Sequence, residues 1–304
     1  MRRGTWPVRG ALLLLAASAA TNAALSNAAE PGYVAEIEAW RAKREAGLKA
    51  DGGWLTVAGL FWLKEGANRF GSGRDNEIVL PASSPARAGT FVVRGADVRV
   101  HFESEVAATV DGQVPAASGT VLHADSAGKP EVVALGPLLM HIIERGGRLA
   151  VRLKDMNAET RRAFTGLHWF PVNEGLRVTA RFVPHAELRP LAVPNILGQV
   201  EKMPSPGYVA FELGGKEHRL SGVFESPGAS ELFFIFKDET SGRETYPAGR
   251  FLYSGLPKDG QVVLDFNRAY NPPCAFTEFA TCPLPPKENW LAARVGAGEL
   301  RYGH

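Results

Sequence analysis

The pattern of hydrophobic and polar positions has a helical period at the start of the chain and a strand period afterwards. Between Tyr33 and Lys49, apolar residues recur at roughly helical spacing among Glu, Arg and Lys side chains. This pattern is typical of an amphipathic helix with one buried face. Gly52 and Gly53 follow shortly after, so we expect the helix to end at these glycines.

Beyond Gly53 the apolar residues either alternate with polar ones or come in short runs bounded by Gly, Pro, Asn and Asp. Both patterns predict β-strands. The expected strands are Thr90–Val93, Val98–Phe102, Val132–Leu135, Leu138–Glu144, Leu149–Leu153, Leu176–Phe182, Tyr208–Leu213, Leu232–Phe236 and Val262–Phe266. Strands at this spacing favour a sandwich or a barrel. The predicted fold class is therefore all-β, with sandwich-like or barrel-like β units and one N-terminal amphipathic helix.

Prolines interrupt the strand pattern near the middle of the chain. They are Pro184, Pro190, Pro194, Pro204 and Pro206. Because proline has no N–H to give to a β-ladder, we expect residues 185–207 to preclude regular pairing and to form a connection. This divides the chain into an N-terminal helix over 30–52, an N-terminal β unit over 53–184 and a C-terminal β unit over 208–304.

The first 29 residues follow neither period. Three arginines precede an apolar stretch over 11–20, and small residues follow it. Thr21 and Asn22 end the apolar stretch, well short of the ~20 residues that a membrane-spanning helix needs. We predict a cleavable signal peptide over 1–29 and a periplasmic or secreted mature chain; the alternative is a retained N-terminal anchor. No integral membrane segment is expected in the mature chain.

Removal of the signal changes the charge balance. The formal net charge is +2 for the whole chain and becomes −1 once Arg2, Arg3 and Arg9 are lost. A near-neutral chain without a Lys/Arg run argues against nucleic acid as a partner, and equally against an anionic membrane surface. Composition leaves the oligomeric state open.

Familiar catalytic and cofactor motifs are absent from the sequence. It has no Gly-x-Ser-x-Gly elbow, no Walker loop and no dinucleotide-type glycine loop. The seven histidines are scattered singly, whereas a zinc site needs closely spaced ligands. We therefore expect no metal and no cofactor, and whether the protein is an enzyme stays open.

One segment of the N-terminal β unit has a second interpretation. Phe70–Leu80 reads FGSGRDNEIVL and is followed by SSPARAGTF. It resembles the start of a forkhead-associated domain, in which a Gly-Arg turn and an Asn-x-Ile-x-Leu strand precede a loop that binds phosphothreonine. Ser72 stands at the position of that family's arginine, and Ala88 and Gly89 stand where its histidine is expected. Phosphate recognition needs such donors, so we expect only a tight Gly-rich turn that leads into a buried strand.

The densest polar run lies near the C-terminus. Residues 265–276 read DFNRAYNPPCAF, and Cys282-Pro283, Pro285-Pro286 and Asn289 follow. This string resembles the hallmark of the bacterial family called domain of unknown function 1684. The likeness extends to Thr245, Tyr246, Gly249, Arg250, Arg152–Asp155, Gly166–Pro171 and Gly53–Leu63. It covers nearly the whole mature chain and implies no reaction.

This run supplies the candidate binding site. On a pleated strand Asp265 and Asn267 would share one face, and Arg268 would lie on the other. Tyr246 and Arg250 are expected on the neighbouring strand of the same hairpin. The full set of candidate ligand-binding residues is Arg152, Asp155, His168, Tyr246, Arg250, Asp265, Asn267, Arg268, Tyr270 and Asn271.

Three functions are compatible with this cluster. The leading hypothesis is a pocket for a small polar or anionic molecule. The second is a cell-envelope hydrolase in which Asp265 or Cys274 carries the chemistry. The third is a structural envelope protein whose polar groups serve the backbone of an irregular loop and bind no ligand.

Cys274 and Cys282 are the only cysteines and are separated by seven residues. In an exported protein such a pair is most simply a disulfide. The alternative is a reactive thiolate at Cys274, activated by Arg250, Arg268 or His168.

Overall fold

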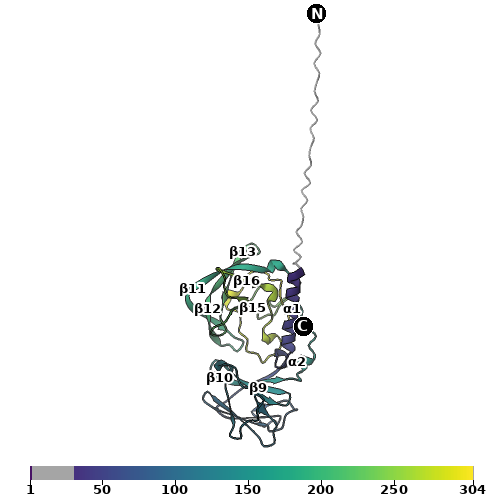
Figure 1. Ribbon diagram of the computed structural model, residues 1–304, viewed down its shortest axis with the longest axis vertical. Helices are drawn as coiled ribbons and strands as arrows, with labels where there is room; N and C mark the ends of the chain where they lie inside the picture. Colours follow the sequence, from purple (N-terminus) through teal and green to yellow (C-terminus); the bar gives the residue numbers. More distant parts are fainter. Residues whose placement is uncertain (2–30, 304) are drawn as a thin grey trace.

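The computed structural model describes Met1 and residues 31–303. Residues 2–30, on which the predicted signal peptide falls, lie outside this description. Figure 1 shows two β units stacked along the long axis, with the helix α1 (Pro31–Lys49) along the side of the unit that contains β11 and β12. No helix in the described part of the chain is long and apolar enough to cross a membrane.

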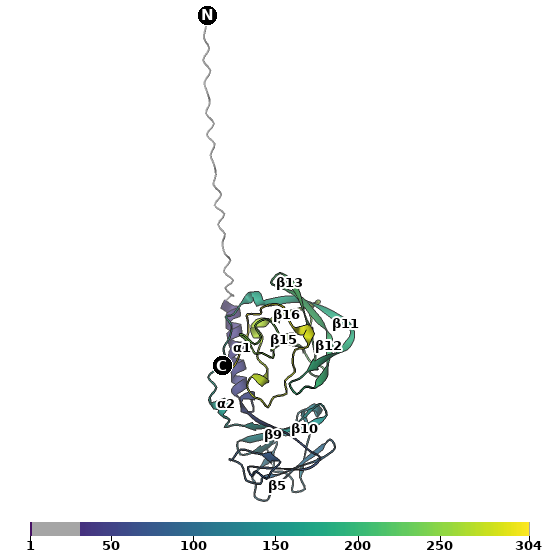
Figure 2. The same cartoon turned by 180° about the vertical axis from the view of Figure 1, so that it is seen from behind.

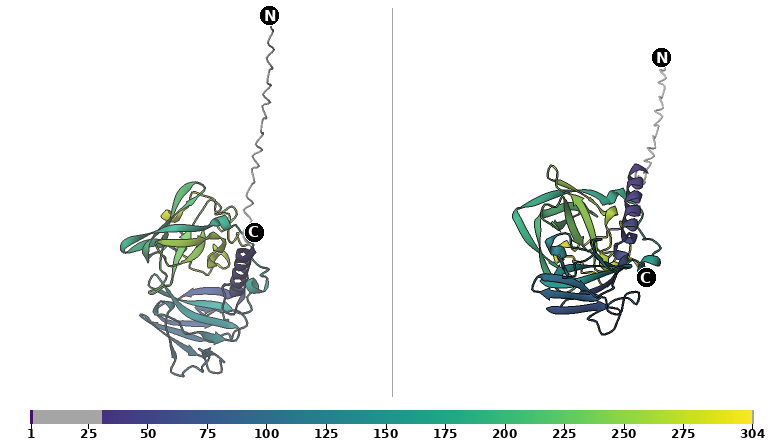
Figure 3. Two further views of the ribbon diagram at one scale, coloured as in Figure 1. Left: turned by 45° about the horizontal axis from the view of Figure 1, so that its top comes forward. Right: turned by 60° about the horizontal axis from the view of Figure 1, so that its bottom comes forward.

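The N-terminal β unit is a sandwich of two five-stranded sheets (Figures 2 and 3). One sheet has the order β1 (Val57–Trp62), β10 (Arg148–Asp155), β9 (Leu138–Arg145), β8 (Val133–Leu135), β6 (Thr109–Val110). The other has the order β3 (Ile78–Val79), β2 (Gly66–Gly71), β4 (Gly89–Arg94), β5 (Asp97–Phe102), β7 (Thr120–Leu122). Alternate side chains of both sheets form one buried core that includes Phe70, Phe91 and Ile142.

The C-terminal β unit holds a four-stranded and a two-stranded sheet. The larger has the order β13 (Lys216–Gly222), β12 (Val200–Leu213), β11 (Arg177–Pro194), β16 (Gln261–Asp265). The smaller pairs β14 (Glu231–Phe236) with β15 (Arg250–Gly255). Its core contains Phe234, Phe236 and Phe266, and the buried residues Val295 and Ala297 of the last segment close it.

The predicted fold class is confirmed. All nine predicted strands coincide with observed strands, except for three end residues: Val132 precedes β8, and Leu176 and Phe266 belong to short 3-10 helices at strand ends. The predicted helix is present and ends at Lys49. Its buried positions are Tyr33, Ile37, Arg41 and Leu48, which recur at the spacing of one helical face.

The expectation for the proline segment is wrong. Residues 185–207 form most of an antiparallel arm between β11 and β12, in which Pro190 lies opposite Pro204. The pairing of β11 with β16 stops at Arg181 and that of β12 with β13 begins at Gly207, so the outer edge of each arm strand has no continuous ladder partner. A proline whose missing N–H would point to a free edge costs no ladder bond.

Two further local expectations are corrected. The chain leaves the extended conformation after Asp265 and forms a 3-10 turn over Phe266–Arg268, so the expected alternation of faces does not continue. Arg250 is not on the hairpin partner of β16, because β15 pairs with β14. We call residues 265–276 the hallmark loop. The β15 backbone contacts this loop directly, through a bridge between Phe251 and Tyr270.

The Gly-rich segment of the N-terminal unit behaves as a turn. The Asn76 side-chain amide donates to the carbonyls of Gly73 and Ala86, at 2.7 and 2.8 Å. Ile78 and Leu80, which follow, are buried. The expected tight turn leading into a buried strand is confirmed.

Candidate functional site

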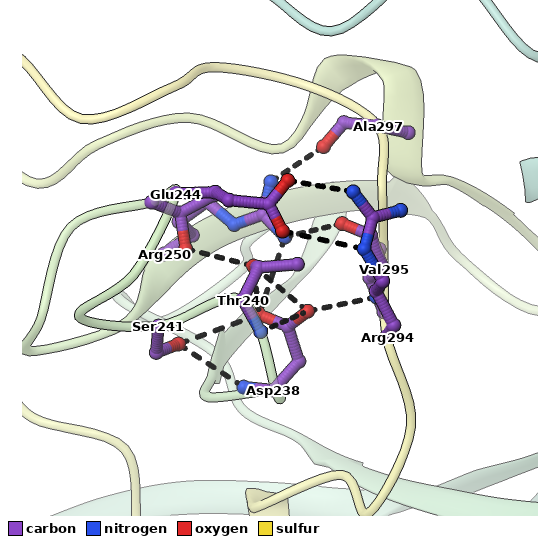
Figure 4. Close-up of polar contacts among 9 residues, drawn as sticks. Asp238, Thr240, Ser241, Glu244, Arg250, Arg294, Val295 and Ala297 are labelled. Carbon is purple, nitrogen blue, oxygen red and sulfur yellow. Dashed lines mark hydrogen bonds and ion pairs between the residues drawn. The ribbon is translucent and has the colours of Figure 1, made fainter.

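Arg250 lies in the interior of the C-terminal unit and faces no cavity. Its side chain has no exposed surface, and neither has that of Asp238, 3.3 Å away. The guanidinium also donates to the carbonyls of Val295 and Ala297, at 3.0 and 2.5 Å (Figure 4). Asp238 accepts further bonds from Thr240 and from the backbone N–H of Val295. We call these five residues the Arg250 cluster, and it ties β15 to the last segment of the chain.

Asp265 and Asn267 form a second buried group, with the start of α1. The Tyr33 hydroxyl donates to Asp265 Oδ1 at 2.7 Å. Asn267 Nδ2 donates to the Tyr33 oxygen at 3.0 Å and to the carbonyl of Asn173 at 2.8 Å. Asn267 Oδ1 accepts the Asn173 N–H at 2.8 Å. These contacts join α1, the segment before β11 and the hallmark loop, so both residues serve the fold.

Four other candidates lie apart from these groups. Asn271 is fully buried and donates to the carbonyl of Leu300 at 2.7 Å. The Tyr246 hydroxyl donates to the carbonyl of Cys274 at 3.0 Å, and burial raises the pKa of its phenol. Asp155 closes a turn at the end of β10 by accepting from a backbone N–H two residues on. His168 is exposed. The structure does not bring these residues into one pocket.

Arg268 and Tyr270 are the candidates that do line a cavity. A cleft of about 490 Å³, which we call the α1 cleft, separates α1 from the C-terminal unit. A volume of this size is within the usual range for small-molecule sites. Its walls are formed by Trp40, Lys43, Arg44, Gly47, Leu48, Trp54, Glu231, Tyr253, Arg268 and Tyr270.

Stacked aromatic rings form one wall of the α1 cleft. Tyr253 and Tyr270 stack with an interplanar angle of 14° and centroids 6.3 Å apart, and Phe233 stacks behind Tyr253 at 4.8 Å. Trp40 of α1 meets Tyr270 at 6.5 Å. Burial raises the pKa of both phenols, so these tyrosines stay neutral at physiological pH. The wall is a preformed apolar surface that adds no negative charge.

Three cations face this wall, and they differ in how far neighbouring carboxylates neutralise their charge. Arg268 is paired with Glu36 and lies 3.4 Å from Asp265 Oδ2, which offsets its charge. Arg44 stacks over Tyr270, with its Cζ 4.6 Å from the ring centroid, and donates to the carbonyl of Asn271 at 3.0 Å. Lys43 is exposed and has no ion pair among the residues described. The positive character of the cleft therefore comes from Lys43 and Arg44.

A buried carboxyl lies behind Arg44. Glu299 has no exposed surface, and its Oε2 is 3.4 Å from Arg44 Nε. Its Oε1 and the Oδ1 of buried Asn271 have no hydrogen-bond partner within the described structure. Burial raises the pKa of Glu299 to about 7, against the opposing effect of Arg44. At neutral pH this carboxyl thus offsets only part of the Arg44 charge.

Glu299 is expected to make stability depend on pH. The native state keeps this proton up to about pH 7, whereas the unfolded chain releases it near the ordinary glutamate value, so the free energy of unfolding falls as pH rises through this window. The expected fall between pH 4.5 and 8 is about 3 kcal/mol, from 1.4 kcal/mol per pKa unit. Urea unfolding from pH 4.5 to 8 measures it, and Glu299→Gln should abolish it.

His141 acts in the opposite direction, because burial lowers its pKa to about 4 and stability from this group rises with pH. The free energy of unfolding should therefore be plotted against pH for both the native and the Glu299→Gln chains, and the two curves subtracted. The contribution of His141 is the same in both chains and cancels in this difference. A difference that does not change with pH would contradict the assignment of the raised pKa to Glu299.

The two cysteines are free thiols in this structure. The predicted disulfide is not shown, since the sulfurs are not at bonding distance. They lie side by side, with the Cys274 N–H donating to Cys282 Sγ at 3.1 Å. The cation beside them is Arg152, and not Arg250, Arg268 or His168 as the thiolate alternative expected.

Sequence reasoning missed most of the α1 cleft. Trp40, Lys43, Arg44 and Gly47 are spaced at i, i+3, i+4 and i+7, which is one face of a helix. The sequence was therefore sufficient to predict that an aromatic residue, two cations and a glycine share one face of this helix. Tyr253 carried no such signal, because only folding brings β15 beside the hallmark loop.

Metal binding finds no support among the residues that the structure describes. No group of three or more His, Cys, Asp or Glu side chains in residues 31–303 is placed to hold a metal ion.

A family model described as "Protein of unknown function (DUF1684)" matches residues 162–300, which include the Arg250 cluster and the hallmark loop but neither Gly53–Leu63 nor Arg152–Asp155. The solution structure of an uncharacterized protein of Haloarcula marismortui is similar at 32% identity, covering 46% of this chain and 78% of that one, with a TM-score of 0.39. The expected bacterial origin is not shown by these matches.

A structure of a phosphothreonine-dependent FHA domain is also similar, at 17% identity over 31% of this chain and 92% of that one, with a TM-score of 0.22. A search of curated proteins found no match.

Proposed function

This chain belongs to the DUF1684 family of proteins of unknown function, and we propose that it binds a small anionic molecule with a flat apolar body in the α1 cleft. The observation that carries the proposal is the pairing of a stacked aromatic wall with two incompletely neutralised cations, Lys43 and Arg44. Flat apolar groups gain from contact with aromatic faces, and a carboxylate or phosphate gains from charge-assisted hydrogen bonds. The only carboxylate in the lining is Glu231, an exposed residue.

The cleft is formed by segments that the rest of the fold fixes in place. α1 is held to the C-terminal unit by Tyr33 at one end and, in its middle, by Arg41, which donates to the carbonyl of Phe170 at 2.8 Å. Arg41 also lies over the Trp169 ring at 5.0 Å. A site whose walls are held by buried contacts loses little conformational entropy on binding.

Two isosteric probes separate the charge of the ligand from its apolar body. Isothermal titration of the mature chain with naphthalene-2-carboxylate and with naphthalene-2-carboxamide should give about tenfold tighter binding of the carboxylate, since one charge-assisted contact contributes about 1.4 kcal/mol. The preference should shrink with added salt. Equal affinity for the two probes, or no saturable binding of either, would overturn the proposal.

A pair of matched variants locates the binding to the cleft. Lys43→Gln should remove most of the preference for the carboxylate. Lys49→Gln removes the same charge from the same helix, but at an exposed position outside the lining, and should leave both affinities unchanged. If the two variants weaken binding equally, the effect is long-range electrostatics and the site lies elsewhere.

Export is a further part of this proposal. The arginines, the short apolar stretch and the small residues at the N-terminus support cleavage within 1–29 and a mature chain that works in the periplasm or outside the cell. N-terminal sequencing of the protein recovered from the extracytoplasmic fraction tests this. A recovered chain that begins at Met1 would contradict it.

A further inference from the structure

Cys274 and Cys282 lie where the two β units meet and are connected to both. Cys274 is half-buried in a short 3-10 turn, Pro273–Ala275, and Cys282 is 5% exposed. The Cys274 N–H donates to Cys282 Sγ at 3.1 Å. Both pack against the buried cluster of Phe233, Phe251 and neighbouring residues. Cys274 is therefore the less buried residue of the pair, and Cys282 is the more buried one.

A buried arginine of the other β unit faces this pair. Arg152 of β10 is 6% exposed and lies over the Trp54 ring, with its Cζ 5.2 Å from the ring centroid. Its Nη2 is 3.4 Å from Thr281 Oγ1, the residue before Cys282, and its Nε has no hydrogen-bond partner among the described residues. An ion pair from a carboxylate to Arg152 is likewise absent from the described part of the chain. A buried cation without a carboxylate is costly unless another anion offsets it.

The neighbouring carboxylate is engaged elsewhere. Asp125 is bound by Arg145 in a two-pronged contact, at 2.9 and 2.8 Å. Arg145 Nε also donates to Thr281 Oγ1 at 3.1 Å. Two arginines thus converge on the residue beside Cys282. Asp125, which Arg145 shares, offsets part of the Arg152 charge, and a thiolate in the cysteine pair would offset more of it.

The two thiols are not equivalent. A hydrogen bond from Cys282 and, more weakly, the charge of Arg152 lower the pKa of Cys274, although burial opposes this. The same hydrogen bond and burial raise the pKa of Cys282. In such a pair the thiolate is the nucleophile. The less buried member, Cys274, is thus the one suited to attack, and the buried member, Cys282, is suited to resolve the product.

We propose that Cys274 and Cys282 form a redox-active pair that reacts with hydroperoxides, with Cys274 as the attacking thiol, Cys282 as the resolving thiol and Arg152 as the positioning cation. The Cys274 thiolate attacks one peroxide oxygen, the O–O bond breaks, and the leaving oxygen takes a proton to give water or an alcohol. Cys274 becomes a sulfenic acid. Cys282 then loses its proton and attacks Cys274 Sγ, the S–O bond breaks, and water leaves. Two thiols are oxidised to one disulfide and one hydroperoxide is reduced.

This inference does not depend on ligand binding in the α1 cleft, because neither cysteine lines that cleft. A small oxidant suits the half-buried position of Cys274. The product disulfide would link Pro273–Ala275 to the segment before Pro283, and an added dithiol would reverse it.

Intact-mass measurement tests the reaction on the whole mature chain. After treatment with hydrogen peroxide and alkylation of the remaining thiols, the native chain should lose two hydrogen atoms and take up no alkyl group. Cys282→Ser should stop at a sulfenic acid on Cys274, trapped as a dimedone adduct. Because the chain has two cysteines in all, the assignment is unambiguous. A Cys282→Ser chain that forms no adduct, or native chain that oxidises only between molecules, would overturn the proposal.

Arg152 has its own test, with a control on the same strand. Arg152→Met should slow peroxide oxidation of Cys274 about tenfold, because the thiolate loses a stabilising cation, and should move the pH midpoint of Cys274 alkylation upward. Arg152→Lys should restore part of the rate. Arg148→Met removes an exposed charge from β10 and should change neither. If the Arg152→Met and Arg148→Met chains have the native rate and pH midpoint, Arg152 has no role in the thiol chemistry.

Discussion

Replacing Arg250 by methionine should lower the free energy of unfolding by about 3–5 kcal/mol, the cost of leaving a buried charge unpaired. The variant leaves Asp238 buried without its cation, and the carbonyls of Val295 and Ala297 without their donor. Methionine keeps much of the aliphatic volume over Phe236, so a cavity contributes little to the loss. Urea unfolding of the mature chain measures the change.

Two further variants serve as controls for the effect of Arg250→Met. Arg243 is an exposed residue in the loop between β14 and β15, and Arg243→Met should change the free energy of unfolding by less than about 0.5 kcal/mol. Asp238→Asn combined with Arg250→Met should be less destabilised than the sum of the single changes, because the two charges are coupled. An Arg250→Met chain with native stability would show that the Arg250 cluster does not hold the fold.

Replacing Asn267 by alanine should cost about 2–4 kcal/mol, because it leaves several buried polar groups without partners at about 1–3 kcal/mol each. The side chain satisfies both the N–H and the carbonyl of Asn173, and it also donates to the Tyr33 oxygen. Its loss removes the contact that joins the start of α1 to the segment before β11. Thermal and urea unfolding both report the change.

Asn157→Ala is the matched control, since Asn157 is exposed and its change should be neutral within about 0.5 kcal/mol. Tyr33→Phe removes one hydroxyl only and should fall between the two variants. If Asn267→Ala were as stable as the native chain while probe binding was lost, Asn267 would belong to a ligand site and the structural assignment would be wrong.

Local periodicity was sufficient to predict most of the fold. β14 is a continuous apolar run because both of its faces are buried. β5 alternates between apolar and polar residues because only one of its faces is buried. Periodicity missed several strands, among them β13, in which only Leu220 and Gly222 are buried, so its sequence carries no apolar period. The β11–β12 arm was misjudged because edge exposure, which makes proline tolerable, is a property of the assembled sheet.

The candidate site was predicted less well, for a physical reason. A dense polar run looks the same in a sequence whether it binds a ligand or satisfies buried backbone groups. The distinction depends on partners far away in the chain, such as Tyr33, which bonds to Asp265 across 232 positions. Arg268 and Tyr270 were found because they belong to that run, whereas Trp40 and Arg44 lie on a helix whose charged face looked merely solvated.

A second groove in the described part of the chain is an alternative place for the ligand. That groove is lined by Pro194, Lys237, Pro285 and the 55% exposed Trp290, among others. Its lining has Lys237 beside the Trp290 ring at 5.3 Å, so it also offers a cation and an aromatic face. A test of the central claim must therefore distinguish the two places.

The tryptophan indole N–H signals in a proton–nitrogen correlation spectrum make this distinction directly. During titration of the mature chain with naphthalene-2-carboxylate, the signals of Trp40 and Trp54 should shift and saturate together, with a smaller change at Trp169, whose ring contacts Trp40. Trp62 and Trp290 should stay in place. Saturable shifts confined to Trp290, or the absence of a saturable shift at Trp40 and Trp54, would contradict binding in the α1 cleft.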